Sequence, residues 1–85
     1  MNREPSAEIC NRLAYNLIRL RAARGLTQRR LGAASGLCKT YISDVEQGNV
    51  NISLANLEAL ALGLDCSIID LLGRAPAKTS TGPTG

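Results

Sequence analysis

Apolar residues recur at helical spacing in five separate stretches of the chain. In the first stretch they follow at intervals of four, four and three residues, at Ile9, Leu13, Leu17 and Leu20. This spacing is typical of one face of a helix. Ser6 precedes the stretch as a candidate N-cap, and Gly25 follows it as a candidate left-handed C-cap.

Two short helices are predicted next, over 28–34 and over about 38–46, with a tight turn at 35–37 between them. Thr27 is placed to cap the first of the two. The residues expected to turn inward are Leu31 and Ala34 on the first helix and Ile42 and Val45 on the second.

A fourth helix is predicted after Ser53, which is a candidate N-cap. Its expected core face consists of Leu54, Leu57, Leu60, Ala61 and Leu64. Asp65 is expected at its C-terminal end. Ser67 and Asp70 have the spacing of a capping box for a last short helix that ends at Gly73.

These stretches divide the chain into three parts: a flexible arm at 1–6, one folded domain at 7–73, and a disordered tail at 74–85 that is rich in Pro, Gly, Ser and Thr. With 85 residues, the chain has room for one small domain. Leu and Ala dominate its apolar residues, and Phe and Trp are absent. The sequence therefore predicts an all-α, five-helix bundle.

The second and third predicted helices have the spacing of a helix-turn-helix. Gly36 allows the chain to reverse direction, and Gly32 is small enough for the two helices to cross closely. The apolar residues expected to fix the crossing angle are Leu31, Leu37, Ile42 and Val45. Such a pair places its second helix where it can enter a DNA major groove, which is about 12 Å wide. An αα-corner that binds nothing has the same spacing and remains an alternative.

The composition argues against catalysis and against a bound metal or cofactor. The chain contains no His, and neither a phosphate-binding loop nor a pair of carboxylates at a pocket is indicated, so we expect no enzyme. The three cysteines, at positions 10, 38 and 66, have no metal-site or disulfide spacing. Reduced thiols, no membrane span and no signal peptide predict a cytoplasmic protein.

Charge is distributed unevenly along the chain. Residues 1–48 hold eight Lys and Arg against four Asp and Glu, whereas residues 49–72 hold three acids and no base. A basic half on a chain of net charge +3 suits a polyanion such as nucleic acid. A basic face that is merely solvated is equally common.

The run LRAARGLTQRRLGAASGLCKTYISDVEQG (20–48), followed by NISLANLEALALGLDCSIIDLL (51–72), resembles the Cro/phage-repressor (XRE-type) helix-turn-helix family. It is especially similar to small stand-alone members such as the controller proteins of restriction–modification systems. The resemblance covers about residues 9–73. It implies a five-helix bundle that binds double-stranded DNA as a homodimer on an inverted repeat.

The resemblance assigns base-reading positions to the outward face of the helix at 38–46, namely Lys39, Thr40, Ser43 and Asp44. Residues matched to, or placed for, contacts with the DNA backbone are Thr27, Gln28, Arg30, Tyr41, Asn49 and Asn51. Arg21 and Glu46 match a pair that family members use as a buried structural ion pair.

Three residues depart from the family pattern. Cys38 stands where members cap the recognition helix with Ser, Thr or Asp; a redox switch at this thiol is an alternative to a plain structural role. Arg30 replaces an acid and either contacts a phosphate or is solvated. Asp44 either accepts a hydrogen bond from cytosine N4 or pairs within the chain with Lys39 or Gln47.

A dimer interface is expected on the acidic half of the domain. Leu62 and Ile69 are apolar where the helical pattern predicts solvent, and Ile68 and Leu72 could complete a self-complementary patch. Scattered exposed aliphatic residues are the ordinary alternative. Tyr15 and Ile18 on the first helix are a second candidate surface.

The sequence thus predicts a DNA-binding transcriptional regulator, in the first place a repressor, that acts on a palindromic operator as a homodimer. Regulation would act through dimerisation or through competition with RNA polymerase, and a contact with the polymerase is left open. The alternative function is an antitoxin-like module that neutralises a protein partner and autoregulates its operon. Cys10 and Cys66 are expected to be small apolar fillers.

Overall fold

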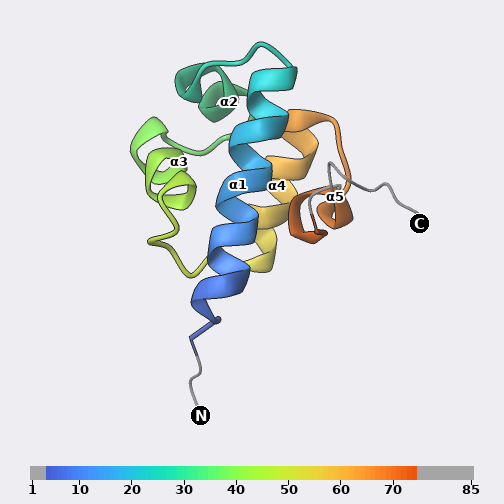
Figure 1. Cartoon of the computed structure of the whole chain (residues 1–85). Coiled ribbons are helices and arrows are strands. Elements are labelled where there is room, and N and C mark those ends of the chain that lie inside the picture. The colour runs from blue at the N-terminus through green and yellow to red at the C-terminus, as the bar shows by residue number, and fades with distance from the viewer. Residues whose placement is uncertain (1–3, 75–85) are drawn as a thin grey trace, which may run out of the picture.

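A computed structural model of the chain describes residues 4–74 as a bundle of five helices without a strand (Figure 1). The helices are α1 (Ala7–Ala23), α2 (Gln28–Ser35), α3 (Lys39–Glu46), α4 (Leu54–Leu64) and α5 (Ile68–Leu72). The predicted all-α, five-helix architecture is therefore confirmed. Most of the predicted tail at 74–85 and the first three residues of the predicted arm at 1–6 lie outside the described residues.

The longest helix, α1, lies between α3 on one side and α5 on the other, and α2 crosses one end of the bundle (Figure 1). α1 packs against both α3 and α5, while α2 packs against α3 and α4. One core connects the five elements, and its fully buried large side chains are Leu17, Leu31, Ile42, Val45, Leu60, Leu64 and Leu71. Burial of this apolar surface is the main force that holds such short helices together.

Side-chain caps fix where most of the helices begin. The hydroxyl groups of Ser6, Thr27 and Ser53 each accept a hydrogen bond from the backbone N–H three residues later. Ser67 and Asp70 form the predicted capping box at the start of α5. Cys38 precedes α3 without a side-chain cap hydrogen bond. We therefore attribute the position of α3 to packing more than to its own N-terminus.

Two predicted core positions are wrong. Ala34 is exposed because α4 approaches α2 along Leu31 and Ser35; a Cβ built on Gly63 of α4 would lie 3.2 Å from both side chains. Leu54 has the spacing of the core face, yet it is 79% exposed. As the first residue of α4, it lies at an end of the helix that its neighbours leave uncovered.

One polar side chain belongs to the core. Asn16 on α1 is fully buried, and its amide nitrogen donates to the carbonyl oxygens of Leu71 and Gly73, both at 2.8 Å. These two carbonyls lie at the end of α5, where helix carbonyls have no partner within the helix. Asn16 therefore fastens the last helix to the first.

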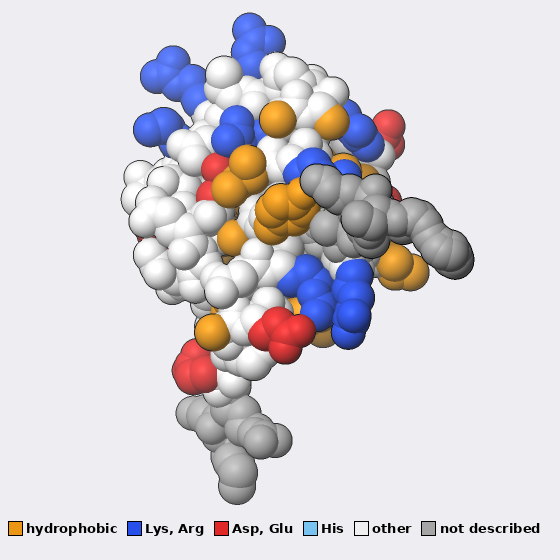
Figure 2. Space-filling model, viewed as in Figure 1, with side chains coloured by type: hydrophobic (Ala, Val, Ile, Leu, Met, Phe, Trp, Pro, Cys, Tyr) orange, Lys and Arg blue, Asp and Glu red, His pale blue; other side chains and the backbone are white. Residues whose placement is uncertain are grey.

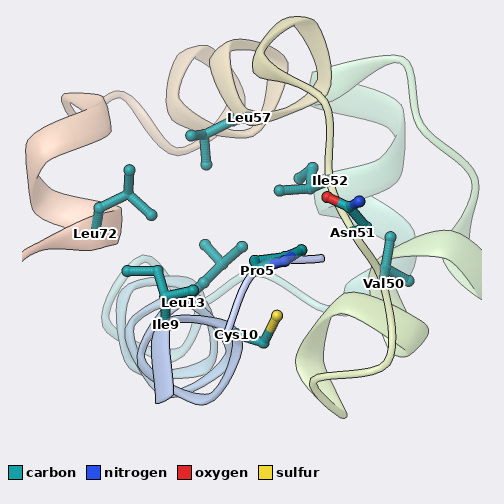
Figure 3. A pocket seen from close by; sticks show the side chains of 9 residues that line it. All are labelled: Pro5, Ile9, Cys10, Leu13, Val50, Asn51, Ile52, Leu57 and Leu72. Carbon is teal, nitrogen blue, oxygen red and sulfur yellow. The ribbon is translucent and has the colours of Figure 1, made fainter. Parts of the chain in front are cut away.

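A cavity of about 170 Å³ lies among α1, the loop before α4, and α5 (Figure 3). Eight of its nine lining residues are apolar or Cys, and Asn51 is the polar one: Pro5, Ile9, Cys10, Leu13, Val50, Asn51, Ile52, Leu57 and Leu72. It offers none of the acid–base or nucleophile pairs that catalysis requires. Within residues 4–74, no helix has the length and hydropathy needed to cross a membrane.

Candidate nucleic-acid interface

Helices α2 and α3 meet at a tight turn with an unusually close backbone approach. Gly36 ends α2 with φ of +77°, a conformation that glycine adopts without strain. A Cβ built on Gly32 would lie only 2.6 Å from the carbonyl oxygen of Leu37. Behind the turn, Leu31 and Ile42 are fully buried. The two glycines and this apolar contact hold α2 and α3 in the arrangement of a helix-turn-helix.

The predicted base-reading residues lie together on one face of α3. Ile42 and Val45 occupy the opposite face, in the core. Lys39 and Thr40 are exposed, whereas Ser43 and Asp44 are half-buried. The structure thus gives α3 an outward surface with one cation, two hydroxyl groups and one carboxylate.

The carboxylate of Asp44 makes no hydrogen bond or ion pair with any other residue of the described part of the chain. The alternative partners were Lys39 and Gln47, but the Gln47 amide nitrogen instead donates to the hydroxyl of Ser43 at 3.1 Å. Asp44 therefore keeps its acceptor atoms for an external donor.

Gln47 is a residue that the sequence analysis did not assign to the interface. Besides its bond to Ser43, its side-chain oxygen lies 3.5 Å from the amide nitrogen of Asn49. Gln47 thereby connects the base-reading face of α3 with the loop that follows. The four-residue spacing between positions 43 and 47 was the signal that would have indicated this contact.

Basic side chains surround the beginning of α2. Arg29 and Arg30 are exposed, and Figure 2 shows Lys and Arg side chains gathered at the end of the molecule where α2 lies. Thr27 accepts a hydrogen bond from the backbone of Arg30. Arg29 is not among the residues assigned from the sequence, although its place as the second residue of α2 indicates a contact with an anion. This end of the molecule carries positive charge next to a helix N-terminus, which favours an anion.

Arg21, Gln28 and Glu46 come together beneath this basic surface. The Arg21 guanidinium and the Glu46 carboxylate form a two-point ion pair, with nitrogen–oxygen distances of 2.6 and 3.1 Å. Glu46 also accepts from the amide nitrogen of Gln28 at 2.9 Å. The third guanidinium nitrogen of Arg21 donates to the carbonyl oxygen of Leu26. Side chains of α1, α2 and α3 are thereby connected through one carboxylate.

The three remaining predicted backbone contacts lie in different surroundings. The hydroxyl of Tyr41 accepts a hydrogen bond from Asn56 on α4, and its half-buried ring packs against the core. Asn49 is exposed in the loop after α3. Asn51 is also exposed, but its amide donates to the carboxylate of Glu4 at 3.3 Å. Asn51 therefore has a negative charge beside it, which disfavours a phosphate there.

The predicted dimer patch contains two strongly exposed apolar side chains. Leu62 is 76% exposed and Ile69 is 78% exposed. Ile68 and Leu72 are half-buried and pack against the core from α5. Tyr15 and Ile18, on the second candidate surface, are exposed to a smaller extent.

The cysteines and acids of the described residues form no group that could bind a metal ion. All three thiols are free. Burial raises the pKa of the Cys66 thiol, and the nearby carboxylate of Asp70 raises it further. Because the thiolate is the reactive form, Cys66 is less reactive than an ordinary thiol at neutral pH.

Comparison with known proteins finds the same architecture. The helix-turn-helix family model HTH_3 matches residues 17–71. The control protein C.SmaI of Serratia marcescens is 37% identical over 83 residues, an alignment that spans 92% of this chain and 99% of that protein.

Two solved structures are similar in both sequence and fold. The restriction-modification controller protein C.AhdI from Aeromonas hydrophila is 39% identical with a TM-score of 0.71, over 73% of this chain and 94% of the other. The hypothetical transcription factor NHTF from Neisseria is 33% identical with a TM-score of 0.76, over 87% and 86% of the two chains.

Proposed function

Since the chain belongs to the helix-turn-helix family of DNA-binding transcriptional regulators, we propose that it represses transcription by binding a palindromic operator as a homodimer. Like its relatives, it is a regulator and not an enzyme. The likeness to C.SmaI and C.AhdI, which are named as control or controller proteins, supports a role of the same kind, the control of a restriction–modification system.

One observation carries the proposal: the outward face of α3 is polar and accessible, while its inner face is fixed in the core by Ile42 and Val45. A helix presented in this way fits the major groove, where each base pair has its own pattern of donors and acceptors. Rigid support matters because side chains select bases only from a fixed helix position.

Each base-reading residue then has a chemical role. The ammonium group of Lys39 donates to guanine N7 and O6, and the methyl group of Thr40 contacts a thymine methyl. The hydroxyl of Ser43, already oriented by Gln47, donates to or accepts from a base edge. The unpaired carboxylate of Asp44 accepts from cytosine N4, and this contact makes Asp44 selective, because elsewhere it would repel phosphates.

Contacts with the DNA backbone determine the register of α3 on the duplex. At the beginning of α2, we assign contacts with one phosphate segment to Thr27, Gln28 and Arg30, and the exposed Arg29 adds positive charge beside them. The remaining backbone contacts of the proposal are Tyr41, Asn49 and Asn51, and the exposed amide of Asn51 must release Glu4 to meet a phosphate. The hydroxyl of Tyr41 accepts from Asn56, so its hydrogen is available for a phosphate oxygen.

Dimerisation supplies the specificity that one recognition helix lacks. Each good base contact discriminates against a wrong base by about 1–3 kcal/mol. Two copies on an inverted repeat therefore double the free energy of discrimination. We place the interface at Leu62, Ile68, Ile69 and Leu72. The strong exposure of Leu62 and Ile69 supports this choice, since burying both against a second copy removes apolar surface from water.

Selection of bound duplexes from a random DNA pool tests the proposal directly. We expect an enriched inverted repeat, two protomers per duplex in sedimentation, and lower reporter expression when the repeat overlaps a promoter. A pool without an enriched sequence would contradict sequence-specific binding. An enriched single half-site bound by one protomer would contradict the dimer, and higher reporter expression would contradict repression.

A further inference from the structure

The carboxylate of Glu46 has one more partner than an ion pair needs. Its side chain is only 6% exposed and accepts three hydrogen bonds, two from Arg21 and one from the amide nitrogen of Gln28. Arg21 lies on α1 and Gln28 is the first residue of α2, whereas Glu46 is the last residue of α3. The ion pair explains the first two bonds, but not why Gln28 joins it.

The third bond determines which way the Gln28 amide faces. A carboxylate only accepts hydrogen bonds, so the amide must turn its nitrogen, and not its oxygen, toward Glu46. The opposite orientation would bring the amide oxygen of Gln28 against an oxygen of Glu46, about 2.9 Å away. An amide nitrogen carries two hydrogens. One is taken by Glu46, and the second remains for another acceptor.

That second hydrogen belongs to the residue proposed above to contact a phosphate. The hydroxyl of Thr27 accepts a hydrogen bond from the backbone N–H of Arg30, and the carbonyl oxygen of Thr27 accepts one from the backbone N–H of Leu31. The backbone N–H groups of Gln28 and Arg29 precede the first hydrogen-bonded turn and have no partner within the helix. An anion there meets these two groups together with the side chain of Gln28.

We propose that Glu46 is a positioning residue for DNA binding: through its carboxylate it orients the Gln28 amide so that a nitrogen-bound hydrogen faces the DNA phosphate. The inference rests on the proposed function, because it needs Gln28 to contact DNA. It gives the buried ion pair a second purpose. The phosphate contact of α2 and the last turn of the recognition helix share one carboxylate, so backbone contact and base contact remain in register.

A double-mutant cycle on DNA affinity tests this role. The probes are a duplex selected from the random pool and a scrambled duplex of the same length. In the wild-type background, we expect Gln28→Ala to lower the affinity for both duplexes by about tenfold or more, which is the effect of losing a hydrogen bond to a charged group. Glu46→Met removes the acceptor but keeps a similar side-chain length. In this background, Gln28→Ala should lower the affinity for both duplexes by less than about twofold.

Arg21→Met is the matched control. It breaks the same ion pair but leaves the carboxylate for Gln28, so the tenfold effect of Gln28→Ala should persist. Thermal melts identify a temperature at which each variant is folded before affinities are measured there. Equal effects of Gln28→Ala in the wild-type and Glu46→Met backgrounds would overturn the inference, as would loss of the effect in Arg21→Met.

A measurement on the wild-type protein needs no destabilised variant. The side-chain amide hydrogens of Gln28, assigned by their absence in Gln28→Ala, should exchange with solvent more slowly than those of Asn11, which is exposed and donates no side-chain hydrogen bond within residues 4–74. Equal exchange would contradict an amide fixed by Glu46. A wild-type protein that binds neither duplex would instead refute the proposed function, so the two failures are distinguishable.

Discussion

At the scale of single residues, the side chains on the outward face of α3 differ in conformational freedom. Lys39 and Thr40 are exposed, whereas Ser43 is connected to Gln47 and through it to Asn49. The first two can adapt to a base edge at an entropic cost, while the third is oriented before DNA arrives. We therefore expect Lys39 and Thr40 to respond most clearly to truncation, because neither side chain makes a hydrogen bond or an ion pair within residues 4–74.

Lys39→Ala and Thr40→Ala should each relax selectivity at one defined base pair of the half-site. The expected loss of discrimination is about 1–3 kcal/mol per contact, measured as the affinity ratio between the selected duplex and its single-base variants. Arg30→Ala is the control, since the loss of a phosphate contact weakens binding to all sequences alike and lowers the salt dependence of the affinity. A uniform loss in Lys39→Ala would reassign Lys39 to the DNA backbone.

At the scale of elements, the helix-turn-helix depends on the close approach at Gly32. The space that a Cβ would need is taken by a backbone carbonyl, which cannot move aside as a flexible side chain can. The substitution must therefore change the angle between α2 and α3. That angle positions the recognition helix relative to the phosphate contacts of α2.

Gly32→Ala should lower the free energy of unfolding by about 1–3 kcal/mol, the range for overpacking a tight core. DNA affinity should fall further than this loss explains, measured at a temperature where the variant is folded. Ala34→Ser, on the exposed side of the same helix, should change stability by less than about 0.5 kcal/mol. A stable Gly32→Ala variant with normal affinity would contradict the required approach.

The last helix depends on a different device. α5 has five residues, too few to be stable alone, and Asn16 supplies hydrogen bonds for its terminal carbonyls. Since α5 carries Ile69, detachment of α5 would also disturb the proposed dimer surface.

Asn16→Leu should lower the free energy of unfolding, measured in urea, by about 2–3 kcal/mol, because it leaves two carbonyl oxygens without their hydrogen-bond donor. Amide exchange in α5 should increase more than in α4. The exposed Asn11→Ala serves as the comparison and should leave both quantities nearly unchanged. If α4 and α5 became equally unprotected in Asn16→Leu, the amide would support the whole core and not α5 in particular.

At the scale of the whole molecule, most basic residues and the exposed apolar residues of the proposed patch lie in different segments of the chain. The basic side chains near α2 belong to the half of the chain that carries the helix-turn-helix, while Leu62 and Ile69 lie in the segment that has three acids and no base. Such a separation allows one surface to face a polyanion and another to face a second copy. DNA affinity should accordingly depend on protein concentration through dimerisation.

Leu62→Asp or Ile69→Asp should produce monomers, since each places a charge in an apolar interface. Sedimentation measures the change in oligomeric state. Operator affinity should also fall, because a monomer loses the binding free energy of the second half-site. Leu54→Asp is a matched control, because Leu54 is equally exposed on α4 but lies outside the proposed patch. An intact dimer in both patch variants would move the interface elsewhere, with Tyr15 and Ile18 as the next surface to test.

The sequence by itself determined the local structure of this protein. The five helices and their caps at Ser6, Thr27, Ser53 and Ser67 depend on residues only three or four positions apart, and so does the turn at Gly36. Interactions of this range are visible in the order of residues, since helix period and capping act within one turn. The same pattern, together with its resemblance to a family, indicated DNA binding and the outward face of α3.

Only the tertiary structure decided which elements meet. Ala34 and Leu54 satisfied the helical pattern but lie where no neighbour covers them. Asn16 and Gln28 found their partners 55 and 18 positions away in the sequence, at Leu71 and Glu46. Pairings of this kind arise when packed helices bring distant side chains together, and periodicity along one helix holds no information about them.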